Sequence, residues 1–68
     1  MLKAQWDNNA APWNLEGQVI RVLKTRSGWQ CRIMEHGQVI QRAFPYNDQQ
    51  QAMYACEDMA EQAWGTKD

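Results

Sequence analysis

The chain has 68 residues and a net charge of −1; 44% of its residues are hydrophobic and 22% are charged. This length allows one small domain, and this composition fits a globular protein rather than a disordered chain. No apolar run approaches the roughly 18 residues of a membrane helix, and the first residues lack the basic and apolar regions of a secretory signal, so we expect a soluble, cytoplasmic protein without membrane contact.

Residues 1–15 are predicted to form an irregular N-terminal arm. The stretch from Asp7 to Pro12 contains turn formers and has neither helical nor strand periodicity. Two tryptophans, Trp6 and Trp13, lie in this arm. Either their indoles fold back over the thin core, or they are exposed anchors for a partner, since tryptophan is enriched at interface hot spots.

Residues 16–65 are expected to form the folded domain, which begins with three strands. The strands are predicted at residues 18–24, 29–35 and 38–44. These runs are rich in β-branched and aromatic residues, and turn formers separate them. His36-Gly37 has the pattern of a two-residue hairpin connection, so Glu35 is expected to pair with Gln38. Which face of the first strand is buried stays open, because its apolar residues fall on both parities.

The hairpin register predicts which side of the sheet faces the core. Side chains alternate between the two faces with period two. The predicted core face carries Trp29, Cys31, Ile33, Ile40 and Phe44, with Arg42 on the same side and its guanidinium in water at the edge. The predicted opposite face carries Gln30, Arg32, Met34, Val39, Gln41 and Ala43.

A helix is predicted from an N-cap at Asn47 or Asp48 to about Trp64, with Gly65 as its C-terminal stop. One stripe of this helix, at the spacing of a buried face, contains Ala52, Cys56, Met59 and Ala63. The opposing stripe, expected to face solvent, contains Tyr54, Glu57, Asp58 and Glu61. The fold class is therefore α+β, a three-stranded antiparallel sheet with one C-terminal helix packed on one face (βββα) and a short tail at 66–68.

The charges are sorted by segment. Residues 16–46 contain five basic residues against Glu16 and Glu35, whereas residues 47–64 contain four acidic residues and no Lys or Arg. The isoelectric point is nevertheless low, about 5.7. The pattern predicts a basic sheet and an acidic helix, and these are the two surfaces on which a charged partner could bind.

No catalytic pattern is visible, so we expect a protein that is not an enzyme. His36 lies at a hairpin tip, and the sequence nominates no group that would orient it. Cys31, Cys56 and His36 lack the number and spacing of zinc ligands, and the glycines form no phosphate-binding loop, so no metal or cofactor is expected. We interpret the cysteines as reduced core thiols; the alternative is one disulfide between helix and sheet.

The strand and hairpin pattern resembles a known DNA-binding domain. Residues 27–33 (Ser-Gly-Trp-Gln-Cys-Arg-Ile), the His36-Gly37 turn and Ala43-Phe44 before a helix are similar to the arm-binding N-terminal domains of phage-type tyrosine recombinases. The resemblance implies a three-stranded sheet plus one helix, with the sheet in a DNA major groove. The same pattern resembles small phage-encoded inhibitor proteins, which are acidic and occupy a protein surface. The recombinase domains are commonly basic, and this helix is not.

The leading hypothesis is a small protein-binding accessory or regulatory protein of phage or mobile-element type, monomeric or weakly dimeric. Its predicted partner-binding residues are Trp6, Trp13, Tyr54, Glu57, Asp58 and Glu61. The alternative is a DNA-binding module that uses the basic sheet, through Arg21, Lys24, Arg26 and Arg32. A third hypothesis is self-association through an open sheet edge or an apolar patch at Met34 and Val39.

Overall fold

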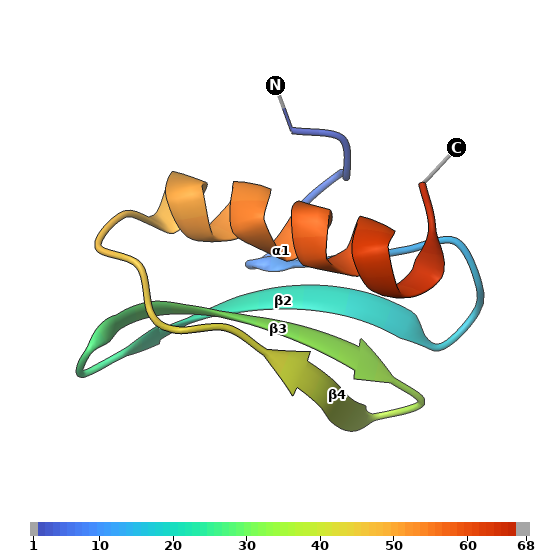
Figure 1. Cartoon of the computed structure of the whole chain (residues 1–68), viewed down its shortest axis with the longest axis horizontal. Helices are drawn as coiled ribbons and strands as arrows, with labels where there is room; N and C mark the ends of the chain where they lie inside the picture. Colours follow the sequence, from blue (N-terminus) through green and yellow to red (C-terminus); the bar gives the residue numbers. More distant parts are fainter. Residues whose placement is uncertain (1, 67–68) are drawn as a thin grey trace.

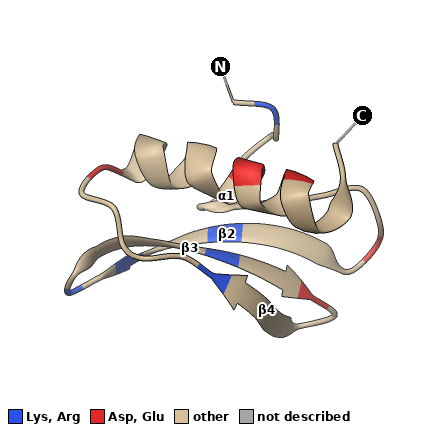
Figure 2. Ribbon diagram, in the orientation of Figure 1, with Lys and Arg blue, Asp and Glu red and all other residues tan. Residues whose placement is uncertain are grey.

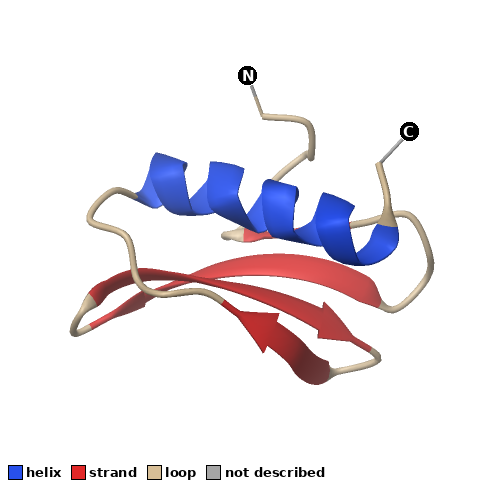
Figure 3. Ribbon diagram, in the orientation of Figure 1, coloured by secondary structure: helices blue, strands red, loops and turns tan. Residues whose placement is uncertain are grey.

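The computed structural model describes residues 2–66, so residues 67 and 68 of the predicted tail lie outside the described part (Figure 1). The elements in chain order are β1 (Ala10–Pro12), β2 (Gln18–Thr25), β3 (Gly28–Glu35), β4 (Gln38–Arg42) and α1 (Gln49–Trp64). The strands form one antiparallel sheet in the order β1-β2-β3-β4. The helix lies across one face of this sheet, which gives a two-layer α+β fold (Figure 3).

The sheet has four strands, so the prediction of three was wrong. The additional strand, β1, lies in the segment predicted to be an irregular arm, and Ala11 pairs with Ile20 of β2. Asn8 and Asn9 both have positive φ, 51° and 65°, and form the turn that brings the chain back alongside β2. Asparagine tolerates this conformation better than most residues. The strand was missed because Ala-Ala-Pro has little β propensity, and its pairing partner supplies the structure.

The register of the β3–β4 hairpin changes at a β-bulge. Glu35 pairs with Gln38 as predicted, but one extra residue is accommodated on β4 after Val39, so that Ile33 pairs with Gln41. A bulge inserts one unpaired residue and re-aims the side chains that follow it. Continued without a bulge, the predicted Glu35–Gln38 register places Ile33 opposite Ile40, and beyond Met34 this register is wrong.

Because of the bulge, the core face differs from the predicted one. Ile40 is 48% exposed and Phe44 is 90% exposed, so neither belongs to the core. Arg42 pairs with Arg32 and not with Cys31, which moves Arg42 from the predicted core side to the opposite face. Sequence periodicity missed this because a single inserted residue inverts every later position of the strand.

Beyond β4 the chain leaves the sheet and then returns to it. Trp29 and Tyr46 exchange two backbone hydrogen bonds, of 2.7 and 2.8 Å, so Trp29 faces Tyr46 and not Phe44. The return passes so close to β3 that a Cβ on Gly28 would lie 2.5 Å from the carbonyl oxygen of Tyr46. Gly28 also has a φ of +133°, which L side chains rarely adopt. The excursion leaves Phe44 and Pro45 outside the sheet ladder.

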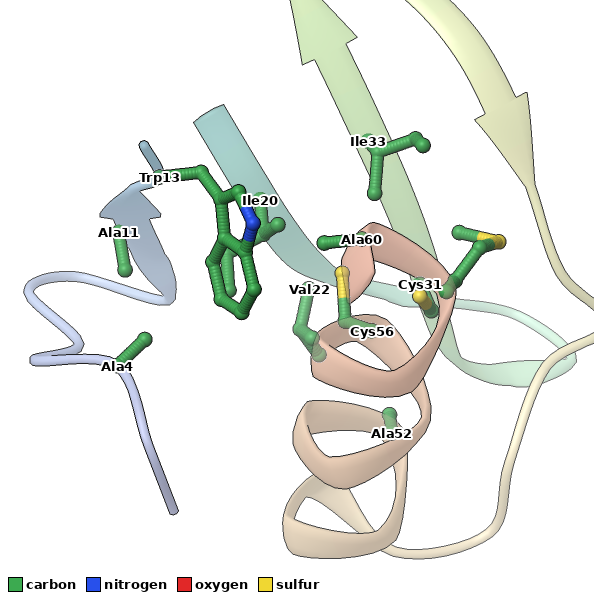
Figure 4. Packing of buried hydrophobic residues seen from close by; sticks show 11 residues of the cluster. Ala4, Ala11, Trp13, Ile20, Val22, Cys31, Ile33, Ala52, Cys56 and Ala60 are labelled. Atoms are coloured by element: carbon green, nitrogen blue, oxygen red, sulfur yellow. The ribbon is translucent and has the colours of Figure 1, made fainter. Parts of the chain in front are cut away.

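The core lies between α1 and the sheet, and Figure 4 shows its side chains. Ile20 and Val22 point inward from β2, which settles the face that the sequence left open. The other buried apolar residues are Ala4, Ala11, Trp13, Cys31, Ile33, Ala52, Cys56, Met59 and Ala60. The predicted inner stripe of the helix is correct except that Ala63 is exposed and Ala60 takes its place. Alanines at this contact allow the helix to lie close to the sheet.

Both cysteines are free and buried at the helix–sheet contact. The Cys56 Sγ atom lies 3.2 Å from the carbonyl oxygen of Arg32 and 3.5 Å from that of Arg21, and its thiol donates toward them. Cys31 hydrogen-bonds to Cys56, and this bond together with burial raises the pKa of the Cys31 thiol. The Cys56 thiol thereby connects α1 to the backbone of β2 and β3, at Arg21 and Arg32.

The helix has the predicted bounds. Asp48 occupies the N-cap position with extended backbone but makes no side-chain capping bond. Gly65 ends the helix with a φ of 92°, and its N–H donates to the carbonyl of Glu61 at 2.8 Å. Within residues 2–66, no helix combines the length and apolar character needed to cross a membrane.

Candidate functional site

The sheet presents one face to α1 and leaves the other uncovered by any described element (Figure 3). We call this second face the outer face. Ile20 and Val22 point toward the helix, and side chains alternate along a strand, so the residues of β2 at odd-numbered positions point outward. The strand positions of the outer face are Val19, Arg21 and Leu23 on β2, Gln30, Arg32 and Met34 on β3, and Val39 and Arg42 on β4.

Three arginines form a line across the outer face. Arg32 of β3 pairs with Arg21 of β2 on one side and with Arg42 of β4 on the other. Directly opposed residues in antiparallel strands have Cα atoms about 4.5–5.5 Å apart, and like charges at such positions are destabilising. This arginine row therefore works against folding, and a bound anion would relieve its repulsion.

No carboxylate among residues 2–66 forms an ion pair with the arginine row. The described residues contain one ion pair, between Lys3 and Glu61, which involves none of the three arginines. Glu35, the acidic residue of the strands, pairs with the buried Gln18 and so has the parity of the inner face. Figure 2 shows basic positions along the strands, whereas acidic positions lie on the helix, in connections and at the end of β3. The outer face is thus positive although the whole chain is not.

The central arginine is held by a side-chain hydrogen bond. Arg32 is half-buried, and its Nε–H donates a 2.9 Å hydrogen bond to Oε1 of Gln30, two residues earlier on the same face. Arg21 and Arg42 are exposed, and within residues 2–66 neither guanidinium has a side-chain hydrogen bond. The row therefore combines one held guanidinium with two that can reorient.

The four basic residues predicted for nucleic-acid binding are only partly brought together. Arg21 and Arg32 are neighbours, but Lys24 has the parity of the inner face and lies with Nζ 5.3 Å from the ring centroid of Trp29. Arg26 lies in the turn between β2 and β3. Arg42 joins the row instead, which the sequence did not reveal because its position depends on the bulge.

An open depression lies beside the arginine row at the end of β4. It has a volume of about 220 Å³ and is lined by Gln30, Arg42, Ala43, Phe44 and Pro45. Its wall is mainly apolar, and Phe44 is 90% exposed.

The acidic stripe predicted for the helix is not a continuous solvent-facing surface. Glu57 is 3% exposed, so its predicted exposure was wrong. Its carboxylate accepts hydrogen bonds from the backbone N–H groups of Lys3, at 3.1 Å, and Ala4, at 2.6 Å, and from Nε1 of Trp6 at 3.3 Å. The residue holds the N-terminal segment against the helix.

The other predicted partner-binding residues are also largely engaged within the chain. Glu61 pairs with Lys3, and this hydrogen bond raises the pKa of the Lys3 amine. Trp13 is buried, and its Nε1 donates to the carbonyl of Gly65 at 3.0 Å. Trp13 therefore belongs to the core, whereas Trp6 is partly buried against it, and a role of Trp6 in binding a partner stays a prediction. Tyr54 and Asp58 are exposed, and their role in binding a partner stays a prediction.

The described residues contain no group of three His, Cys, Asp or Glu side chains that could hold a metal ion. His36 lies in the β3–β4 turn with a φ of 52°, and its ring is next to Gly17.

No protein-family model matches the chain, and no curated protein or solved structure is significantly similar to it.

Proposed function

We propose that this protein binds duplex DNA through the outer face of its sheet. The observation that carries the proposal is the arginine row: Arg21, Arg32 and Arg42 occupy adjacent strands on an uncovered face, and none has a carboxylate partner among residues 2–66. Lys and Arg that neutralise phosphates supply most of the affinity of proteins for DNA. Of the hypotheses drawn from the sequence, this one uses charged residues that no ion pair engages among residues 2–66.

The dimensions of the sheet support the proposal. Neighbouring strands lie about 4.8 Å apart, so the arginines on β2 and β4 are separated by about 10 Å. A major groove of B-DNA is about 12 Å wide and admits strands as well as a helix. In this mode of binding the sheet faces the groove with Arg32 toward its floor, and Arg21 and Arg42 toward the phosphates on its two sides.

The low isoelectric point does not oppose this mode of binding. Two of the acidic residues of α1, Glu57 and Glu61, are engaged by the N-terminal segment. The molecule measures 31 × 27 × 21 Å. Charges on opposite faces are therefore farther apart than the Debye length of about 8 Å at physiological ionic strength, and the outer face acts locally as a basic surface.

The test is fluorescence anisotropy with a labelled duplex, comparing the wild-type protein with R42A and R26A. Both substitutions remove one positive charge, but only Arg42 belongs to the arginine row. We expect salt-dependent binding, which R42A weakens while reducing the slope of log K against log salt by about 1, and which R26A leaves nearly unchanged. Absence of binding at low salt and micromolar protein, or equal effects of the two substitutions, would contradict the proposal.

A further inference from the structure

The hydrogen bond from Arg32 to Gln30 distinguishes the central arginine from its neighbours. The bond joins the Nε–H of Arg32 to Oε1 of Gln30, with 2.9 Å between the two heavy atoms, and restricts the rotation of the guanidinium. A guanidinium has five N–H donors in a rigid fork, so the two Nη groups remain available with four of them. Both residues are half-buried on the outer face, which restricts the alternative rotamers of Arg32.

The position of Arg32 separates its role from that of the flanking arginines. It lies on β3, between β2 and β4, so a duplex seated on the outer face places the base edges opposite Arg32. Arg21 and Arg42 lie on the strands at either side and reach toward the walls of the groove. Contacts with phosphates position a protein, whereas contacts with base edges specify the sequence.

The donor pattern of the held guanidinium matches one base. Guanine presents two acceptors, O6 and N7, side by side in the major groove, and arginine is its most frequent bidentate partner. Adenine offers a donor beside its acceptor, and cytosine offers a donor, so neither matches two parallel N–H groups. A pre-oriented pair of Nη groups loses less conformational freedom when it binds such a pair of acceptors.

We infer that Arg32, oriented by Gln30, recognises guanine through O6 and N7 in the major groove. This inference rests on the proposed DNA-binding function and deepens it, because it turns a phosphate-binding face into one with base preference. Gln30 is a positioning residue: it acts on the base through the orientation of Arg32.

The experiment compares two duplexes of alternating guanine and cytosine, one normal and one with 7-deazaguanine. The modified base keeps its charge and its Watson–Crick pairing but has a C–H group where N7 was. For the wild-type protein we expect about tenfold weaker binding to the modified duplex, since a good bidentate contact discriminates by about fivefold or more.

Variants separate this specificity from general affinity. R32K keeps the charge and loses the fork, so the ratio of the two affinities is expected to fall to about one, and Q30A is expected to lower the ratio in the same direction. R42A is expected to weaken both duplexes alike and to preserve the ratio. Circular dichroism establishes that each variant is folded before its affinities are compared.

The outcomes distinguish the two proposals. Salt-dependent binding with equal affinity for both duplexes overturns guanine recognition and leaves the DNA-binding function standing. A ratio that persists in R32K also overturns the assignment to Arg32. Absence of binding to either duplex at low salt overturns both proposals.

Discussion

Glu57 connects the two ends of the chain through a single buried carboxylate. Its two oxygens accept three N–H groups from residues 3–6, and the side chain lies beside the core of α1. Hydrogen bonds to a charged acceptor are stronger than neutral ones, and a buried donor that loses its acceptor carries the full cost of desolvation. The carboxylate that looked like part of a binding surface is therefore a structural anchor.

A substitution at Glu57 tests this role. E57Q replaces one acceptor oxygen by an NH₂ group that faces N–H donors, so we expect the free energy of unfolding to fall by about 1–3 kcal/mol. D58N removes the same charge from the exposed neighbouring position and is expected to change it by less than about 0.5 kcal/mol. Urea denaturation of both variants measures the difference; equal stabilities would show that the three hydrogen bonds do not anchor the arm.

The raised pKa of the Cys31 thiol gives stability a defined pH dependence. An unfolded thiol, with a pKa of 9.0, loses its proton at a pH at which folded Cys31 keeps its own. The contribution of Cys31 is thus present below the unfolded pKa of 9.0 and is lost as the pH rises above it. Urea denaturation between neutral pH and pH 10 should show a flatter decline for C31A than for the wild type. Parallel declines would contradict this origin.

At the scale of elements, the features that depend on neighbouring residues were predicted correctly, whereas those that depend on distant contacts were missed. The His36-Gly37 turn, the second and third strands and the helix up to Gly65 follow from turn formers, β-branched runs and a helical stripe, which act over a few residues. In contrast, β1 depends on pairing with β2, and the bulge in β4 depends on the whole β3–β4 ladder. Such features follow from tertiary contacts and override propensity.

The residues of the candidate site could likewise be predicted only where a local pattern places them. Arg21 and Arg32 could be named because they lie in recognisable strands, and Arg42 could not be placed because the bulge reverses its face. The burial of Glu57 has no local signal, since its partners lie more than fifty residues earlier. The surplus of tryptophans in the arm was the nearest hint that this segment packs against the helix.

Gly28 provides a test of the chain return that follows β4. G28A places a methyl group 2.5 Å from the carbonyl oxygen of Tyr46, whereas the Cβ of G37A would meet no atom within 4 Å, although both glycines have positive φ. Both variants carry the backbone penalty, of order 1–3 kcal/mol, and G28A adds a steric clash. Thermal denaturation should therefore show a clearly larger loss of stability for G28A; equal losses would argue against the tight Trp29–Tyr46 pairing.

At the scale of the whole molecule, the segregation of charge in the sequence becomes a separation of faces. The sheet carries the arginine row outward, and α1 carries its carboxylates on the other side of the core (Figure 2). The two surfaces are not equivalent, because intramolecular contacts engage Glu57 and Glu61 while the arginines have no carboxylate partner among residues 2–66. A polyanion is the partner that this arrangement favours.

The most direct test of DNA binding through the outer face is an NMR titration of the isotope-labelled protein with duplex DNA. We expect the largest changes in chemical shift at the backbone amides of β2, β3 and β4 and at the Nε–H of Arg21, Arg32 and Arg42, with little change along α1. Shifts concentrated on α1 and the N-terminal segment, or no shifts at all at low salt, would contradict binding through the outer face.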